Sequence, residues 1–435
     1  MLPEPVRRRV DAMWDRIWAS GVSNPLTAVE YVSTVLLLRR LAETHPAASE
    51  WAEVREHVAA GSAGAVARTM VRVQSAFGIG ASPEASAAST WSDLATLDHV
   101  LREVAALEIG DRNHDILGDV FEHVLNHLST AGRFGQFRTP RHVIQLLVAA
   151  VDPQPGEVVL DPAAGTAGFL IAAHEHRRGA AGAYVGHEVD ATVARVARTN
   201  LLLHGIRSGQ VHHGDSLAVT SRDADVVLAN PPFAGTVAPE RVREYQSGTT
   251  RTELLFLELT MRRLVPGGRA GVVVPTNVLT ATGHAPTWIR SRLLESNRLR
   301  AVVELPAGVF RPYTDVRTAL LLWSNDAPAD DVLLVRVDAD GYTLDDKRRP
   351  TDRDDLPGAL ALIRGGTSAV PHVRVPADEL RRSGYNLSPS RYIPLDAQAT
   401  PTAPGGPTGA DLLLRARAAT AALEAEIDAF ARLLR

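Results

Sequence analysis

Short β-branched, near-continuously apolar runs alternate with helical stretches along the middle of the chain. The runs lie at 158–160, 184–186, 211–213, 226–229, 271–274, 301–305 and 319–323, and helical stretches such as 191–204 and 253–265 separate them. Strands that are apolar along their whole length belong to parallel sheets that helices cover on both faces. The pattern therefore predicts an α/β fold with a mostly parallel sheet, which binds ligands at the carboxyl ends of its strands.

The segments on either side of this alternation differ in pattern. We predict a helical domain over 1–132, where apolar residues repeat every three or four positions. The α/β domain is expected over 133–395 and contains a charged, loop-like stretch at 338–355. A Pro/Gly/Thr-rich linker at 396–409 leads to an amphipathic helix at 410–435, whose apolar stripe needs a surface on this chain or on a partner.

Composition excludes several classes of protein. The 435 residues contain no Cys, which excludes disulfides, zinc–thiolate sites and iron–sulfur clusters and fits a reducing cytosol. The net charge of −4 provides no overall attraction to phosphate, so a nucleic-acid partner requires local arginines or another subunit. No apolar run reaches about 18 residues, so we expect neither a membrane span nor a signal peptide. Lys347 is the single lysine and does not follow a glycine, which excludes a P-loop nucleotidase.

A loop of small residues follows the first predicted strand. The sequence DPAAGTAG at 161–168 contains Asp161, Gly165, Thr166 and Gly168 and leads directly into a helical stretch. Glycine lets the backbone turn sharply and approach a ligand, and the start of a helix offers unpaired N–H groups. These properties favour a loop that binds a nucleotide-type cofactor, and a mere tight turn remains the alternative.

Acidic residues end the next two predicted strands. Glu188 lies 27 residues after Asp161, close to the position at which dinucleotide-binding sheets carry an acid for the ribose hydroxyls. Asp215, in the sequence Gly-Asp-Ser, ends the following strand and is placed to accept a hydrogen bond from an adenine amino group. Solvated strand ends are the alternative for each acid.

Four residues after the strand at 226–229 point to a reaction. Asn230, Pro231, Pro232 and Phe233 combine an amide, two rigid residues without N–H groups and an aromatic ring. The Asn230 amide oxygen and a neighbouring carbonyl can accept both hydrogens of one amino group, while Phe233 stacks on the ring that carries it. Such a site suits alkylation of an exocyclic amine on a base taken out of its stack. A proline turn after an edge strand is the alternative.

These segments resemble those of a known family, the methylation subunits of type I restriction-modification systems. Members are S-adenosylmethionine-dependent DNA adenine-N6 methyltransferases with the gamma order of motifs. The similarity covers most of the chain and rests on segments in the family's order at 135–140, 161–170, 186–190, 200–205, 214–217, 230–233, 252–256, 266–270, 308–314, 345–348 and 385–392. Residues 24–27 and 35–41 are similar to the helical domain that these subunits place around DNA and their partner.

The resemblance implies a Rossmann-like methyltransferase sheet with an N-terminal helical domain, a C-terminal helix and S-adenosylmethionine as the cofactor. The methyl group would go to N6 of adenine in double-stranded DNA, with the target amine and base held by residues 230–233 and without a metal. The residues implied to bind the cofactor are Gln136, Phe137, Thr139, Pro140, Asp161, Gly165, Thr166, Gly168, Glu188 and Asp215.

The same resemblance implies partners. A separate specificity subunit would contact residues 1–132 and the helix at 410–435 and would select the DNA sequence. A restriction subunit with a motor joins some complexes of this kind. We expect the chain to act in the cytoplasm, with no membrane involved.

Three positions depart from the family pattern. Ala164 stands where a Cys is common, Ala167 where a Gly is common, and Arg138 where an aromatic residue is common. A Cβ at Ala167 would clash with the cofactor if that position needs a positive φ. The departures at Ala167 and Arg138 leave open a catalytically weak DNA-binding scaffold as an alternative function. A second alternative is methylation of a protein glutamine or an RNA amine, because an Asn-Pro-Pro-aromatic site serves those acceptors too.

Two other patterns are set aside. His123 and His127 have a spacing that metal ligands use, but no Glu follows His123, so we predict ordinary histidines on a helix face. Residues 345–347 resemble the Asp-x-Lys arm of metal-dependent nucleases, but their surroundings match the methyltransferase family instead.

Overall fold

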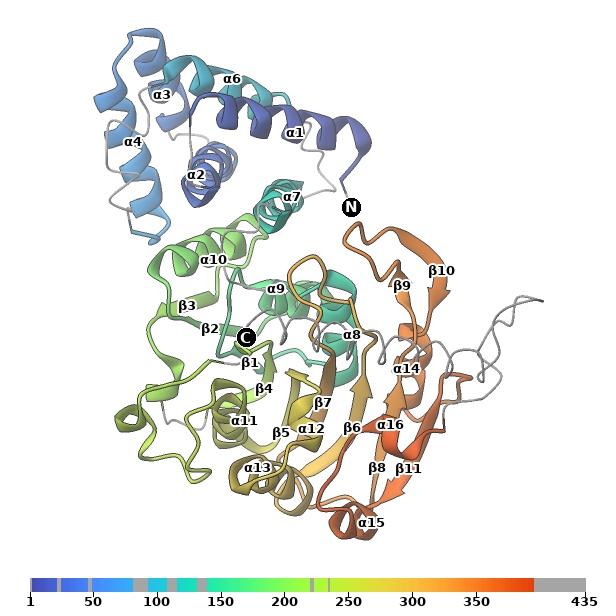
Figure 1. The fold of residues 1–435 in the computed structure, drawn as a ribbon. Coiled ribbons are helices and arrows are strands. Elements are labelled where there is room, and N and C mark those ends of the chain that lie inside the picture. Colours follow the sequence, from blue (N-terminus) through green and yellow to red (C-terminus); the bar gives the residue numbers. More distant parts are fainter. Residues whose placement is uncertain are drawn as a thin grey trace, which may run out of the picture. The chain divides into compact units, whose positions relative to one another are not determined.

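The computed structural model describes residues 2–21, 25–45, 49–80, 93–107, 116–130, 139–219, 223–233 and 235–394. One compact unit runs from Met1 to Ile393 (Figure 1). The predictions for the linker at 396–409, for the helix at 410–435 and for Gln136, Phe137 and Arg138 lie outside the described residues. The side chains of residues 25–27 and 126–130, which include His127, lie outside them as well.

A nine-stranded sheet forms the centre of this unit, with the order β11-β8-β6-β7-β5-β4-β1-β2-β3. Neighbouring strands are parallel except where β7 or β11 is involved. The predicted mostly parallel sheet is confirmed. The strands are β1 (Val158–Asp161), β2 (Ala183–Glu188), β3 (Gly209–His213), β4 (Ala224–Ala229), β5 (Leu264–Pro275), β6 (Arg298–Glu304), β7 (Thr318–Ser324), β8 (Asp331–Arg336) and β11 (His372–Pro376).

Helices pack on both faces of the sheet, as continuously apolar strands require. One face carries α8 (Arg141–Val151), α9 (Gly168–His176), α10 (Ala191–Leu203) and α14 (Leu356–Ile363). The other carries α11 (Thr252–Arg263), α12 (Asn277–Thr280) and α13 (His284–Glu295). Shorter elements are η2 (Ser216–Ala218), η3 (Pro239–Val242), α15 (Ala377–Arg382) and α16 (Pro389–Tyr392).

The prediction of a helix through residue 265 was wrong at its end. Helix α11 stops at Arg263, and Leu264 already pairs with Ala224 of β4. Pro266 has no N–H with which to continue a helix, and Gly267 adopts a φ of 78°. The register between β4 and β5 shifts across this segment and becomes regular again from Arg269. Strand β5 therefore begins seven positions before the apolar run at 271–274 from which it was predicted.

The prediction of a loop over 338–355 was also wrong. Strands β9 (Asp340–Tyr342) and β10 (Pro350–Asp354) pair antiparallel as a separate two-stranded sheet. Asp340 is buried, and His142 Nε2 lies 2.9 Å from its carboxylate, which also pairs with Arg348. Burial alone would raise the pKa of Asp340, but these two partners hold it below its usual value. The buried Asp340 carboxylate, paired with Arg348 and His142, thus anchors this charged segment, and the local sequence pattern gave no sign of these contacts.

Helices precede the sheet, as predicted for the N-terminal region. They are α1 (Glu4–Ala19), α2 (Pro25–Thr44), α3 (Glu50–Ala59), α4 (Ala63–Ala76), α6 (Leu94–Ala105) and α7 (Ile116–Thr130). Their apolar core includes Val196 and Leu203 of α10. Within the described part of this region, His123 on α7 lies 2.7 Å from Asp11 on α1, so this histidine joins two helices.

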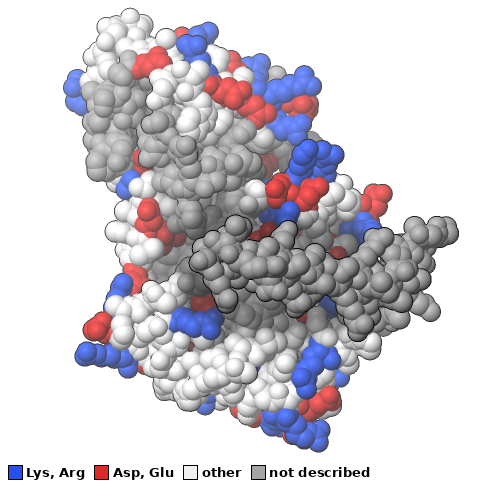
Figure 2. Space-filling view, viewed as in Figure 1, with Lys and Arg blue, Asp and Glu red and all other residues white. Residues whose placement is uncertain are grey.

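The described surface is mixed in charge. In the view of Figure 2, Lys and Arg side chains are interspersed with Asp and Glu, without one large basic face. No helix among the described residues is long and apolar enough to cross a membrane.

Candidate active site

The carboxyl ends of β1, β2, β3 and β4 border one cavity of about 360 Å³. The small-residue loop, the two strand-end acids and residues 230–233 all contribute to its lining. The lining residues are Pro162, Ala163 and Gly165 after β1, His187, Glu188 and Val189 at β2, Gly214, Asp215, Ser216 and Leu217 after β3, Asn230, Pro231, Pro232 and Phe233 after β4, and Val237, Arg241, Thr252 and Phe256 beyond them. The sheet therefore brings together residues that lie up to 94 positions apart in the sequence.

The loop between β1 and α9 has two residues in the left-handed region. Gly165 has a φ of 51°, and a Cβ added to it would meet no atom within 4 Å, so this part of the loop borders open space. Ala167 has a φ of 69° and a ψ of 24° at the N-cap of α9. Its position therefore does need a positive φ, which disfavours a side chain by about 1–2 kcal/mol. Its methyl is fully buried in the core, however, and does not line either of the cavities beside the loop.

Two buried carboxyl groups, those of Asp161 and Glu188, lie next to the loop between β1 and α9. Glu188 is 6% exposed and accepts hydrogen bonds of 3.0 Å from the backbone N–H groups of Gly165 and Asp190. Burial raises the pKa of Glu188 in spite of these donors. Burial also raises the pKa of Asp161, to about 8, although the Ala163 N–H donates to it, and the nearby Glu188 carboxylate raises it further. At neutral pH, Asp161 therefore keeps its proton and can donate as well as accept a hydrogen bond.

Asp215 closes another side of the cavity. Its carboxylate caps η2 by accepting a 3.1 Å hydrogen bond from the Leu217 N–H. It also pairs with the exposed Arg241 of η3, which sequence reasoning did not single out. An amino group that approaches Asp215 from the cavity would share this carboxylate with Arg241.

The segment after β4 is held from two directions. Asn230 Nδ2 donates a 2.8 Å hydrogen bond to Thr139 Oγ1, which comes from the residues just before α8. The Pro232 carbonyl accepts a 3.0 Å hydrogen bond from Thr252 Oγ1 at the start of α11. The Phe233 ring meets the buried Phe310 ring edge to face, with 6.3 Å between centroids. These contacts orient the amide and the ring before any ligand binds.

A smaller cavity of about 70 Å³ adjoins the first at the cofactor loop. Thr139, Asp161, Thr166, Gly168 and Asn230 are among the residues that line it. Pro140 is the N-cap of α8 and lines a different cavity, which also includes Thr139 and Gly168. Of the other residues predicted to bind a cofactor, all those that the structure describes line one of the two cavities beside the loop.

Asn200 connects the loop to the N-terminal helices. This fully buried residue of α10 donates from Nδ2 to the Thr166 carbonyl at 2.8 Å and to Glu122 Oε1 of α7 at 2.7 Å. Sequence reasoning noted Asn200 only as part of a family segment and assigned it no contact. An asparagine in a helix looks like a solvated residue, so only the fold reveals this bridge.

Sequence reasoning also missed His187 and the role of Thr252. Burial lowers the pKa of His187 to about 4, helped by Arg263 and His212, so its ring is neutral in the cavity at pH 7. Sequence reasoning placed His187 directly after the predicted strand run at 184–186, within a family segment, without indicating which way its ring points. Thr252 was noted as the start of a motif, but its hydrogen bond to Pro232 spans 20 residues and left no local signal.

The cavity suits a ligand that carries a nucleoside. Its volume of about 360 Å³ lies within the range of about 300–1,000 Å³ that small-molecule sites occupy. The carboxylates of Glu188 and Asp215 supply acceptors for hydroxyl and amino groups, while Leu217 and Phe256 form apolar walls. These acceptors, the apolar walls and the open space at Gly165 therefore fit S-adenosylmethionine.

Comparison with known proteins places the chain in a family. Residues 112–400 match the model of the N-6 DNA Methylase family. The chain is 36% identical over 238 residues to the type I restriction enzyme EcoEI methylase subunit of Escherichia coli, across 50% of this chain and 48% of that protein. It is 33% identical over 246 residues to the StySPI methylase subunit of Salmonella potsdam, across 50% of this chain and 46% of that protein. The chain spans about half the length of these curated relatives.

Solved structures agree on the fold. The methyltransferase subunit of the type I restriction-modification system from Streptococcus thermophilus superposes with a TM-score of 0.72 at 20% identity, covering 90% of this chain and 99% of that one. A chain from a type I R-M system, solved to explain its complex assembly and conformational transition, gives a TM-score of 0.68 at 25% identity, with 99% of both chains covered. Since the family model matches well over half of its residues, this chain belongs to the N-6 DNA Methylase family.

Proposed function

We propose that this chain is a methylation subunit that transfers the methyl group of S-adenosylmethionine to N6 of adenine in double-stranded DNA. One observation carries the proposal. Residues 230–233, with the chemistry to grip an amino group on an aromatic ring, line the same cavity as the small-residue loop, Glu188 and Asp215. Membership of the N-6 DNA Methylase family and similarity to methylase subunits support the same reaction.

The residues around the loop would hold the cofactor. Glu188 would accept hydrogen bonds from the ribose hydroxyls and Asp215 one from the adenine amino group, with Thr139 and Thr166 beside the methionine end. Gln136 and Phe137 join this set by the family resemblance alone. S-adenosylmethionine supplies a methyl group already activated by a sulfonium leaving group. The task left to the protein is therefore to place the target nitrogen in line with that methyl carbon.

Residues 230–233 would do this placing. The Asn230 amide oxygen and the Pro231 carbonyl would accept the two hydrogens of the adenine amino group, which directs the nitrogen lone pair outward. The neighbouring Pro232 carbonyl already accepts a hydrogen bond from Thr252 Oγ1. Phe233, braced by Phe310, would stack on the flipped base.

The names of the relatives also suggest partners for this chain. The relatives are named as subunits of type I restriction enzymes, and we propose that this chain acts with a separate specificity subunit that reads the DNA sequence. The N-terminal helices and the segment at 410–435 would form the contacts with that subunit. A restriction subunit would join in systems that also cleave DNA, and the complex would act in the cytoplasm.

Methyl transfer from labelled cofactor tests the proposal. The complex of chain and specificity subunit is incubated with unmethylated DNA, and Asn230→Ala and Phe233→Ala are compared with the wild type. Because both residues position the acceptor, each change should lower the rate by about 100-fold or more. Phe233→Tyr keeps the stacking ring and should retain most of the activity.

A matched control is Asn325→Ala, which removes an asparagine at the opposite edge of the sheet, where its Nδ2 donates to the carbonyls of Leu264 and Val265. This variant should methylate DNA normally. Undiminished labelling in Asn230→Ala and Phe233→Ala would remove these residues from the reaction. Labelling of protein or RNA instead of DNA would reject DNA as the substrate.

A further inference from the structure

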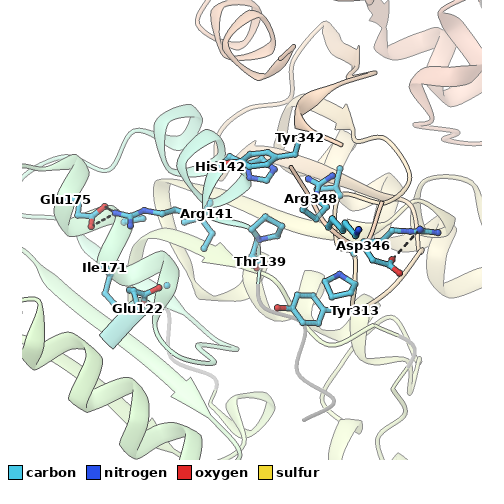
Figure 3. Close-up of a pocket in the computed structure, with 18 of the residues that line it drawn as sticks. Glu122, Thr139, Arg141, His142, Ile171, Glu175, Tyr313, Tyr342, Asp346 and Arg348 are labelled. Atoms are coloured by element: carbon cyan, nitrogen blue, oxygen red, sulfur yellow. Dashed lines mark hydrogen bonds and ion pairs between the residues drawn. The ribbon is translucent and has the colours of Figure 1, made fainter. Parts of the chain in front are cut away.

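A second cavity, of about 380 Å³, lies next to the proposed active site (Figure 3). It opens between the start of α8, helix α9, residues 309–313 and the segment that joins β9 to β10. Thr139 belongs to its lining, and the Thr139 hydroxyl is the group that accepts the 2.8 Å hydrogen bond from Asn230. A ligand in this cavity would therefore lie one residue away from the amide that grips the target amine.

The arginines of this cavity are already neutralised by carboxylates of the same chain. Figure 3 shows two of these pairs, one of them between Arg141 and Glu175. The pairs are Arg141 with Glu175 at 3.1 Å, Arg311 with Asp346 at 3.3 Å, and Arg348 with Asp340. They order the walls of the cavity but leave little net charge for a ligand.

Lys347 differs from these arginines. Lys347 is an exposed residue of the cavity lining, and its ammonium forms no hydrogen bond or ion pair with any residue in the described parts of the chain. It is also the single lysine among 435 residues. A flexible, strongly hydrated point charge of this kind is a usual contact for a phosphate group.

The remaining wall is aromatic. The rings of His142 and Tyr342 lie side by side, with 4.8 Å between centroids and 30° between planes, and Arg348 covers the Tyr342 ring at 5.5 Å. Tyr313 faces the cavity from another segment. Such surfaces accept sugars and bases without regard to sequence. The cavity thus combines a free cation, aromatic surfaces and enough volume for a nucleotide.

We propose that this cavity receives a nucleotide next to the target adenine and that the Lys347 ammonium contacts a phosphate of that strand. This inference rests on the proposed DNA methyltransferase function. It gives a purpose to the Asp-Asp-Lys sequence at 345–347, which was set aside as a nuclease motif.

The salt dependence of DNA binding tests the contact. The logarithm of the DNA-binding constant falls linearly with the logarithm of the salt concentration, and each phosphate contact makes this slope steeper by about 0.9. Between about 50 and about 200 mM salt, one contact therefore accounts for about a 3.5-fold change in affinity. The complex of chain and specificity subunit is titrated with unmethylated duplex DNA. Lys347→Gln should reduce the magnitude of this slope by about 0.9, while Lys347→Arg should leave it unchanged. The matched control is Arg349→Gln, an exposed cation two residues away that does not line the cavity.

Chemical protection supplies a second readout. Because Lys347 is the single lysine, acylation by an N-hydroxysuccinimide ester labels one side chain, and peptide mass spectrometry separates it from the α-amino group. Bound DNA should protect Lys347 from the reagent.

The outcomes separate this inference from the function on which it rests. A smaller slope in Lys347→Gln alone, with protection by DNA, supports the phosphate contact. If the wild type methylates DNA but Lys347→Gln keeps the wild-type slope, or Arg349→Gln lowers it equally, the contact is rejected and the methyltransferase function stands. If the wild type binds DNA but transfers no methyl group to it, the proposed function fails, and the placement beside a target adenine fails with it.

Discussion

Replacing Asn200 by alanine should remove the bridge between the loop at 161–168 and the N-terminal helices. The buried amide donates to the Thr166 carbonyl at 2.8 Å and to the Glu122 carboxylate at 2.7 Å. A hydrogen bond to a neutral carbonyl contributes about 0.5–1.5 kcal/mol, and one to a charged group about 1.5–3 kcal/mol. Asn200→Ala should therefore lower the free energy of unfolding by about 2–4 kcal/mol.

The same change should weaken cofactor binding. The bond to Thr166 holds the loop in its left-handed turn at Ala167, so its loss leaves fewer molecules with the loop ready to bind. A loss of about 0.5–1.5 kcal/mol corresponds to an affinity for S-adenosylmethionine that is roughly 2- to 12-fold lower. Titration calorimetry measures this affinity, and denaturant unfolding measures the stability.

Asn325→Ala serves again as the control, because it also removes an amide that donates two hydrogen bonds, here of 3.1 Å each to the carbonyls of Leu264 and Val265. It should destabilise the fold by about 1–3 kcal/mol without changing cofactor affinity. If Asn200→Ala bound the cofactor as tightly as the wild type, the bridge to Thr166 would have no part in organising the loop.

Further predictions concern the core beneath the loop. The pKa of Asp161 is raised to about 8 in the fold, so the folded chain holds a proton that the unfolded chain releases near pH 4, and stability should fall as pH rises from about 4 to 8. One such group contributes up to about 1.4 kcal/mol per pH unit, and Asp161→Asn should remove this part of the slope in unfolding curves measured across that range. Gly186→Ala should lower the free energy of unfolding by about 1–3 kcal/mol, because the new Cβ would lie 2.9 Å from the Ala164 Cβ and 3.3 Å from side-chain atoms of Leu170 and Val211. Thermal denaturation checks this change, and an unaltered midpoint would contradict the packing at this contact.

Much of the fold and of the first cavity could be predicted from local sequence. A strand buried on both faces is apolar along most of its length, so the runs from 158–160 to 319–323 marked strands before any tertiary information was used. The residues after β1 to β4 meet because parallel strands end at the same edge of the sheet. The errors at 253–265 and 338–355 arose where a proline-glycine bulge and a buried ion pair decided the structure.

The contacts that complete the site depended on tertiary packing. Thr139 meets Asn230 across 91 residues, and Glu122 meets Asn200 across 78. Lys347 joins the same cavity as Arg141 although 206 positions separate them. A polar side chain shows the same local pattern whether it faces solvent or a distant partner, because hydrophobic periodicity reports burial and not the identity of the neighbour. The sequence thus determined the sheet and the edge that carries the candidate site. The packing of helices on that sheet decided which distant residues hold the loop, the Asn230 amide and the neighbouring cavity in place.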